Sequence, residues 1–244
     1  MSQPEPAPDP QLIRWGGVAG VAGVILLLCS VAVVVALGLP DASDVETLTD
    51  FPDIESGRIA EHFLYLGALI LFALHTFVLH RLLRTAHPAP ALFGTVIAAF
   101  GLVIMAASSL LHVSTSPLAD LYHSPDTPAE DLQAIEYAWF GAQSVFDTML
   151  ATGVLLVPIG ILLLGVAMRS DAPAFGPHLS MLTIGLGTVG TIGAAAEVVD
   201  PGSDFSAAGV LAIAVFYFSI GWRTVRLGTN ASIDLTDSEQ TPVD

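Results

Sequence analysis

Residues 15–39 read WGGVAGVAGVILLLCSVAVVVALGL, and this stretch decides the fold class. None of these residues is charged. At about 1.5 Å per residue, a helix of this length crosses a hydrocarbon core of about 30 Å. Arg14 precedes it as in a signal peptide, but the apolar stretch exceeds the roughly 7 to 15 residues usual for such a segment. We therefore expect a retained transmembrane helix.

The rest of the composition agrees with this expectation. Hydrophobic residues make up 53% of the chain and charged residues only 12%, with a mean hydropathy of +0.72. A soluble domain could not cover its surface with so few charges. We expect an all-α, multi-pass protein of the cell membrane, with the lipid bilayer as its main partner.

The charged residues that do occur are strongly unbalanced. Twenty-three acidic residues face seven basic ones, all of them arginine, which leaves a net charge of −16. This balance resembles that of halophilic archaeal proteins. It also argues against nucleic acid as a partner, because phosphate binding needs clustered basic side chains. Lysine is absent, so the chain cannot form a retinal Schiff base, and its one cysteine, Cys29, cannot form an intramolecular disulfide.

Five further apolar segments predict a bundle of six transmembrane helices. The fourth is too long, because a continuous helix from Asp131 to Arg169 would measure about 58 Å. We expect it to break or protrude, with an interfacial helix over 130–142 before the span and a kink at Pro158. The expected spans cover approximately residues 59–83, 89–113, 144–168, 179–199 and 205–222.

Outside the spans, the chain is polar. We predict a transmembrane domain over 14–226, flanked by disordered cytoplasmic tails at 1–13 and 227–244. We also predict an exposed loop over 40–57, which has six acidic groups and no base. Arginines favour cytoplasmic loops. A cytoplasmic N-terminus places six of the seven arginines inside and leaves only Arg58 outside, so we predict that both termini are cytoplasmic.

Two glycine patterns point to helix packing. Residues 185–190 (GLGTVG) match a dinucleotide-binding fingerprint, but they lie inside an apolar span rather than after a strand, so close helix contact is the favoured interpretation. Small residues also recur every three or four positions in the third span, which predicts one contacting face. That face comprises Gly94, Ala98, Gly101, Met105, Ser108 and His112.

Polar residues gather near the expected outer ends of the spans. Charges in a bilayer are costly and mark candidate sites, so such a cluster could bind a divalent metal, relay protons or hold a polar solute. The alternative is that these side chains simply reach interfacial water. The candidate outer pocket, between the second and fifth spans, consists of Glu61, His62, His112, Glu136, Gln143, Asp147 and Glu197.

His75 differs because it lies deeper, at least about one turn inside the inner interface. We expect a neutral imidazole bonded to a neighbouring helix. Haem would need histidines at matched depth on adjacent helices. His62 and His112 could form one such pair, and they are the metal ligands if there are any, but His75 has no evident partner. No cofactor is therefore predicted.

Several motifs resemble an uncharacterised prokaryotic family of six-helix membrane proteins, known as a domain of unknown function. They are the long loop after the first span, the basic end HRLLR at 80–84, LLVPIGILLLGVAMRS at 155–170, and GPHL at 176–179. The resemblance covers most of residues 15–222, with His178 where the family usually has a basic residue. It implies the six-helix fold but carries over no activity.

Three hypotheses for function remain. The favoured one is a non-enzymatic membrane protein, either a small permease-like carrier or an accessory or sensing component, that takes a small polar solute or ion into the outer pocket. The second is a metal- or haem-dependent redox enzyme that uses outer histidines and carboxylates. The third is a structural bundle whose polar residues satisfy one another. An oligomer or a membrane partner protein is compatible with each.

Overall fold

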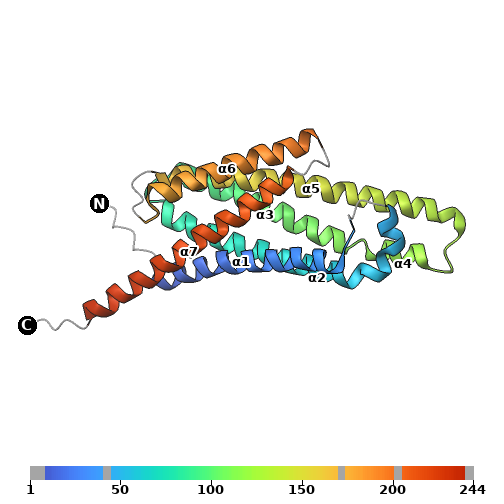
Figure 1. The fold of residues 1–244 in the computed structure, drawn as a ribbon, viewed down its shortest axis with the longest axis horizontal. Helices are drawn as coiled ribbons and strands as arrows, with labels where there is room; N and C mark the ends of the chain where they lie inside the picture. Colours follow the sequence, from blue (N-terminus) through green and yellow to red (C-terminus); the bar gives the residue numbers. More distant parts are fainter. Residues whose placement is uncertain (1–8, 41–44, 170–173, 201–204, 240–244) are drawn as a thin grey trace, which may run out of the picture.

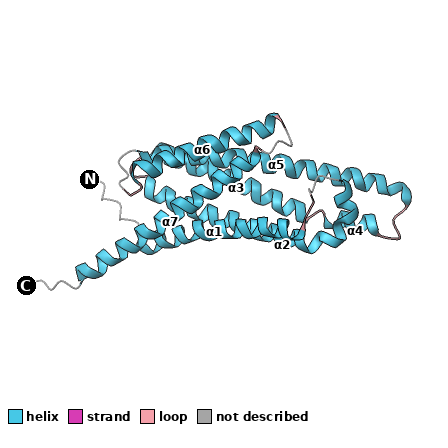
Figure 2. Ribbon diagram, in the orientation of Figure 1, coloured by secondary structure: helices cyan, strands magenta, loops and turns pink. Residues whose placement is uncertain are grey.

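The computed structural model describes residues 9–40, 45–169, 174–200 and 205–239, which are almost entirely helical (Figures 1 and 2). Within these ranges there are seven helices and no strand. The helices are α1 (Pro10–Leu37), α2 (Val45–Leu83), α3 (Pro88–Val113), α4 (Ser116–His123), α5 (Ala129–Arg169), α6 (Gly176–Val199) and α7 (Ser206–Glu239).

Six helical stretches in the described ranges are long and apolar enough to cross a membrane, which confirms the predicted six-helix bundle. Their outward faces carry large apolar side chains such as Phe63, Phe93 and Phe100, all strongly exposed. Exposed apolar surface on this scale is stable against lipid but not against water. The fold is that of a multi-pass membrane protein.

The two ends of the bundle differ (Figure 1). α1 begins and α7 ends at one end of the bundle, which we call the terminal end. At the other, the capped end, α4 and the first turns of α2 and α5 extend beyond the tips of α6 and α7. Six arginines lie near the helix ends that form the terminal end: Arg14, Arg81, Arg84, Arg169, Arg223 and Arg226.

The cap has a small hydrophobic core of its own. Leu48 and Phe51 of α2, Ala119 of α4 and Trp139 of α5 are buried together. The rings of Phe51 and Trp139 lie 5.2 Å apart, edge to face. The prediction of an exposed loop over 40–57 is therefore wrong from Val45 onward, where the segment is helical. The reason is that Leu48 and Phe51, which lie among the acidic residues, are buried in the cap core. Residues 41–44 lie outside the described ranges.

The long fourth segment does not break. α5 runs without interruption from Ala129 to Arg169 and extends beyond the tips of α6 and α7. The predicted separate helix over 130–142 is therefore wrong, and the alternative that the segment protrudes is confirmed. Its upper part stays helical outside the bundle core because Trp139 packs into the cap core. Helix also exceeds the predicted limits elsewhere: α1 begins at Pro10, where Asp9 caps the amide of Gln11, and α7 continues to Glu239.

The stripe predicted on α3 is confirmed as a helix contact for the residues that can be placed. A Cβ added at Gly160 of α5 would lie 2.6 Å from the backbone nitrogen of Ala98, and one added at Gly94 would lie 2.9 Å from the carbonyl of Gly160. Met105 and Ser108 are also buried. The side chain of His112 lies outside the described residues. Glycine is required here because the two backbones touch.

The glycine motif of α6 serves the same purpose. A Cβ at Gly187 would lie 2.5 Å from the backbone nitrogen of Leu162, and one at Gly190 would lie 2.9 Å from the ring of Pro158. Gly185 faces open space. Helix packing is thus confirmed for two of the three glycines that match the fingerprint.

Candidate functional site

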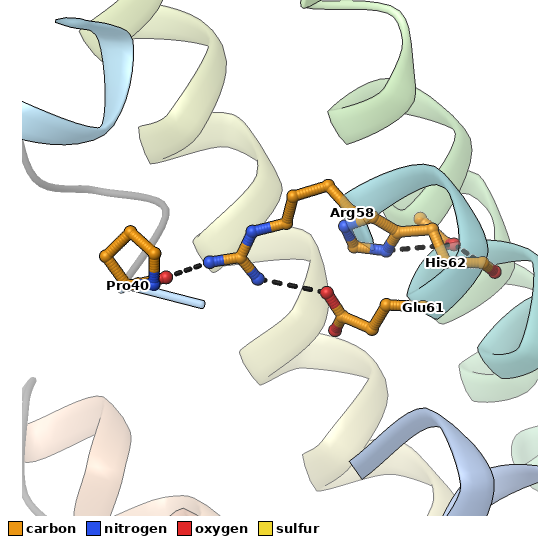
Figure 3. A network of polar contacts seen from close by, with 5 residues as sticks. Pro40, Arg58, Glu61 and His62 are labelled. Atoms are coloured by element: carbon orange, nitrogen blue, oxygen red, sulfur yellow. Dashed lines mark hydrogen bonds and ion pairs between the residues drawn. The ribbon is translucent and has the colours of Figure 1, made fainter. Parts of the chain in front are cut away.

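Arg58 lies at the centre of the polar groups at the capped end (Figure 3). The residue is only 7% exposed, and its Nη1 donates to Glu61 Oε2 at 2.9 Å, an ion pair within one turn of α2. Its Nη2 donates to the carbonyl oxygen of Pro40, just beyond the end of α1. Arg58 thus ties the α1–α2 connection to the body of α2.

His62 follows one turn further along α2. It is buried against α3, where the Ser109 hydroxyl lies 3.4 Å from His62 Nδ1 and donates to the His62 carbonyl at 3.2 Å. On its other side, the ring of Phe146 from α5 stands edge-on at 6.0 Å. His62 therefore joins α2, α3 and α5 at one level.

Gln143 of α5 is the most unusual residue of this region. It is 2% exposed, yet neither its amide nitrogen nor its amide oxygen bonds to any residue that the structure describes. One turn above it, the indole N–H of Trp139 is also buried without a hydrogen bond in the described part of the chain. Buried polar groups are almost always bonded in proteins, so a pair of orphaned groups on one helix face marks a candidate site.

The predicted outer pocket is only partly brought together. Glu61 and His62 lie beside Arg58, and Gln143 is buried on α5, the helix whose Phe146 contacts His62. Glu136 is half-buried at the rim of the cap, where the Tyr122 hydroxyl donates to it at 3.3 Å. The side chain of His112 cannot be placed among the described residues.

Asp147 and Glu197 do not share the buried junction. Asp147 is exposed on α5 although Gln143 is buried. Their side chains point in directions about 40° apart around the helix axis, and this rotation takes Asp147 out of the packed face. Glu197 is half-buried near the end of α6, which packs on α5 and α7. In Figure 1 the tip of α6 and the Arg58 region of α2 lie on opposite sides of α5.

The donor set does not favour a metal centre. Among the side chains that the structure describes, no three His, Cys, Asp or Glu residues come together in a way that could hold a metal ion. The metal-dependent alternative thus gains no support from these residues, and we derive no chemistry from it.

His75 belongs to a separate interface. It is fully buried, and its Nδ1 donates to the carbonyl of Gly16 in α1 at 2.8 Å. The hydrogen bond to a neighbouring helix is confirmed. Next to it, the Thr76 hydroxyl bonds to the Tyr217 hydroxyl of α7 at 2.8 Å. These contacts join α1, α2 and α7, while His75 Nε2 is buried without a hydrogen bond in the described part of the chain.

Sequence reasoning missed Arg58, Trp139 and Ser109 as members of the site. The signal for Arg58 was present, because it is the one arginine outside the terminal end and stands among acidic residues. Trp139 and Ser109 gave no comparable signal, since an indole or a hydroxyl in an apolar segment is common.

Comparison of the chain with models of known families, with curated proteins and with solved structures finds no match. The resemblance to the six-helix family therefore remains a prediction from the quoted motifs. What the fold defines is a class, a multi-pass membrane protein of six spans with a helical cap.

Proposed function

We propose that this protein is a non-enzymatic membrane component that binds a small polar solute at the junction of the cap and the bundle, in a sensing or accessory role. The observation that carries the proposal is Gln143, a buried amide without a hydrogen bond to any described residue. Leaving such a group unpaired costs about 1 to 3 kcal/mol. A bound solute that bonds to the amide recovers this cost.

The distribution of polar groups favours binding over transport. Below His62 and Ser109, the space between α3 and α5 is closed by Met105 against Gly153 and by Val157 against Gly101. Met105 and Val157 belong to the main hydrophobic core, which continues toward the terminal end. A permease-like carrier, the second candidate, would have to part these helices, whereas a sensor needs only the upper site.

The cap supports the same proposal. It is built from three separate chain segments, and its core directly contacts the helix that carries Gln143. A solute bound beneath it would touch both the cap and the bundle, so that occupancy changes how tightly the cap is held. We infer that the cap is the part through which binding is sensed. The orientation we propose, with both termini cytoplasmic, places it outside the cell.

The test is the thermal stability of the detergent-purified protein against a panel of small amides, polyols, carboxylates and amines. At least one solute is expected to raise the melting temperature of the wild type but not of Gln143→Leu. Gln133→Leu is the matched control, because Gln133 is exposed on the same helix, where its amide nitrogen donates to the Tyr137 hydroxyl. Failure of the entire panel to shift the wild type would overturn the proposal.

A further inference from the structure

α1 and α7 lie against each other at the terminal end, where α1 begins and α7 approaches its end (Figure 1). A Cβ added at Gly228 of α7 would lie 2.6 Å from the backbone nitrogen of Arg14 and 2.8 Å from its Cβ. A Cβ added at Gly17 of α1 would lie 2.7 Å from the carbonyl oxygen of Gly221. Because the two backbones touch at both points, Arg14 is fixed at the level of Gly228, next to α7.

Two arginines and two tryptophans are exposed at this level. Trp15, which follows the exposed Arg14 on α1, is 68% exposed, and Trp222 of α7 is 50% exposed. The guanidinium carbon of the exposed Arg226 lies 5.3 Å from the centre of the Trp222 ring, a cation–π contact. Trp222 and Arg226 precede Gly228 by six and two residues, about 9 and 3 Å along the helix axis. The four side chains therefore lie within a band of about two helical turns, and we call them the terminal belt.

The terminal belt faces the surroundings of the bundle. The third helix at this pair, α2, contacts α1 through the bond from His75 to Gly16 and α7 through the bond between Thr76 and Tyr217. It therefore covers one side of the α1–α7 pair. The belt residues are exposed, so they lie on the outer side of the pair, which lipid surrounds.

The terminal belt carries positive charge and no negative charge. Although the chain has 23 acidic residues, α1 contains none, and α7 contains none before Asp234, eight residues beyond Arg226. Asp9, just before α1, caps the first turn of that helix. Arg14 and Arg226 form no ion pair with any side chain that the structure describes. An anion can therefore approach both guanidinium groups without competition from a described carboxylate.

The residue types of the belt suit the headgroup region of a bilayer. Tryptophan prefers this depth because its ring is apolar while its N–H needs a polar partner. Arginine presents a planar set of N–H donors that matches the oxygens of a phosphate. A phospholipid brings a phosphate to this depth and lays its acyl chains along the apolar helices below.

We propose that the terminal belt binds the headgroup of an anionic phospholipid. Arg14 and Arg226 donate hydrogen bonds to its phosphate oxygens, and the two indoles flank the headgroup. A zwitterionic lipid also carries a phosphate, but the same arginines repel its ammonium group, so a headgroup with net negative charge binds more tightly. The belt lies at the opposite end of the bundle from the cap, and its lipid does not depend on solute binding there.

The test is tryptophan quenching in vesicles of equal parts phosphatidylglycerol and phosphatidylcholine, in which the acyl chains of only one lipid carry bromine. Trp15→Phe serves as the background, so that Trp222 reports on the lipid at the belt. Trp139, the third tryptophan of the chain, is buried in the cap core and away from lipid. Each arginine near an anionic surface changes affinity roughly fivefold, so we expect phosphatidylglycerol to be preferred roughly 5- to 25-fold.

Three double variants in this background separate the belt from the charge of the whole end. Arg14→Gln/Arg226→Gln is expected to bring the preference close to one. Arg14→Lys/Arg226→Lys, which keeps the charge, should retain most of it. Arg81→Gln/Arg84→Gln is the matched control, because it removes two exposed arginines near the end of α2, at the same end of the bundle. Its preference should equal that of the background protein.

Three results would overturn the inference. Equal quenching by the two lipids in the background protein would show that the belt does not select a negative headgroup. An equal loss of preference in the control would show that the net charge of this end, rather than the belt, attracts the lipid. Displacement of phosphatidylglycerol by inorganic phosphate, but not by chloride at the same ionic strength, would identify free phosphate as the occupant in place of a lipid.

Discussion

His75 Nδ1 of α2 donates a hydrogen bond to the carbonyl oxygen of Gly16 in α1, 2.8 Å away and out of reach of solvent. Gly20, one turn further along α1, permits this approach, because a Cβ there would lie 3.0 Å from His75 Cγ. The glycines of α1 and the histidine of α2 therefore form one contact.

Replacing His75 with leucine should weaken this contact without opening a large cavity. Hydrogen bonds between membrane helices contribute about 0.6 kcal/mol on average and up to about 1.7 kcal/mol. We expect His75→Leu to lower the free energy of unfolding by an amount in that range, measured by detergent titration. His178→Leu, at an exposed position, should stay within about 0.5 kcal/mol of the wild type. Equal effects of the two changes would argue against a role for the bond.

The contact between α3 and α5 gives a second prediction. Gly160→Ala would drive a Cβ to within 2.6 Å of the Ala98 nitrogen and force the helices apart. Overpacking of this kind costs about 1 to 3 kcal/mol. Gly185→Ala is the control, because nothing lies within 4 Å of the added atom, and there alanine should be neutral or stabilising by up to about 1 kcal/mol. A loss of stability in both variants would contradict packing as the reason for Gly160.

The third prediction concerns the ion pair at the capped end. Arg58→Met leaves the largely buried Glu61 carboxylate without its cation, which we expect to cost on the order of 3 kcal/mol in the free energy of unfolding. The double variant Arg58→Met/Glu61→Gln removes the uncompensated charge and should recover part of the loss. If the single and double variants unfold alike, the pair does not stabilise the capped end.

Orientation can be tested with single cysteines in a Cys29→Ser background. Asp126 lies in the exposed connection between α4 and α5 at the cap, and Thr85 lies in the exposed turn after α2 at the terminal end. With both termini cytoplasmic, a membrane-impermeant maleimide added to intact cells should label Asp126→Cys and not Thr85→Cys. The reverse pattern would invert the proposed topology and place the solute site on the cytoplasmic side.

The site could be predicted only in part. Glu61, His62 and Gln143 stood out because polar groups in an apolar segment are costly, whatever their partners. The contacts of this part of α2 with α5, Phe51 with Trp139 and His62 with Phe146, join segments far apart in the chain, which no local pattern encodes. The spacing of Asp147 and Gln143 places both on one face of α5. Only the packing of neighbouring helices decides that Gln143 is covered and Asp147 is not.

The sequence by itself determined the six spans and the helix faces that pack, because hydropathy and the spacing of small residues are local properties set by the bilayer and by helix geometry. Only the tertiary structure decided the cap. Leu48, Phe51 and Trp139 are too sparse to form a periodic signal, and α4 is too short. Their segments become helical through burial against one another, an energy that exists only once distant parts of the chain have met.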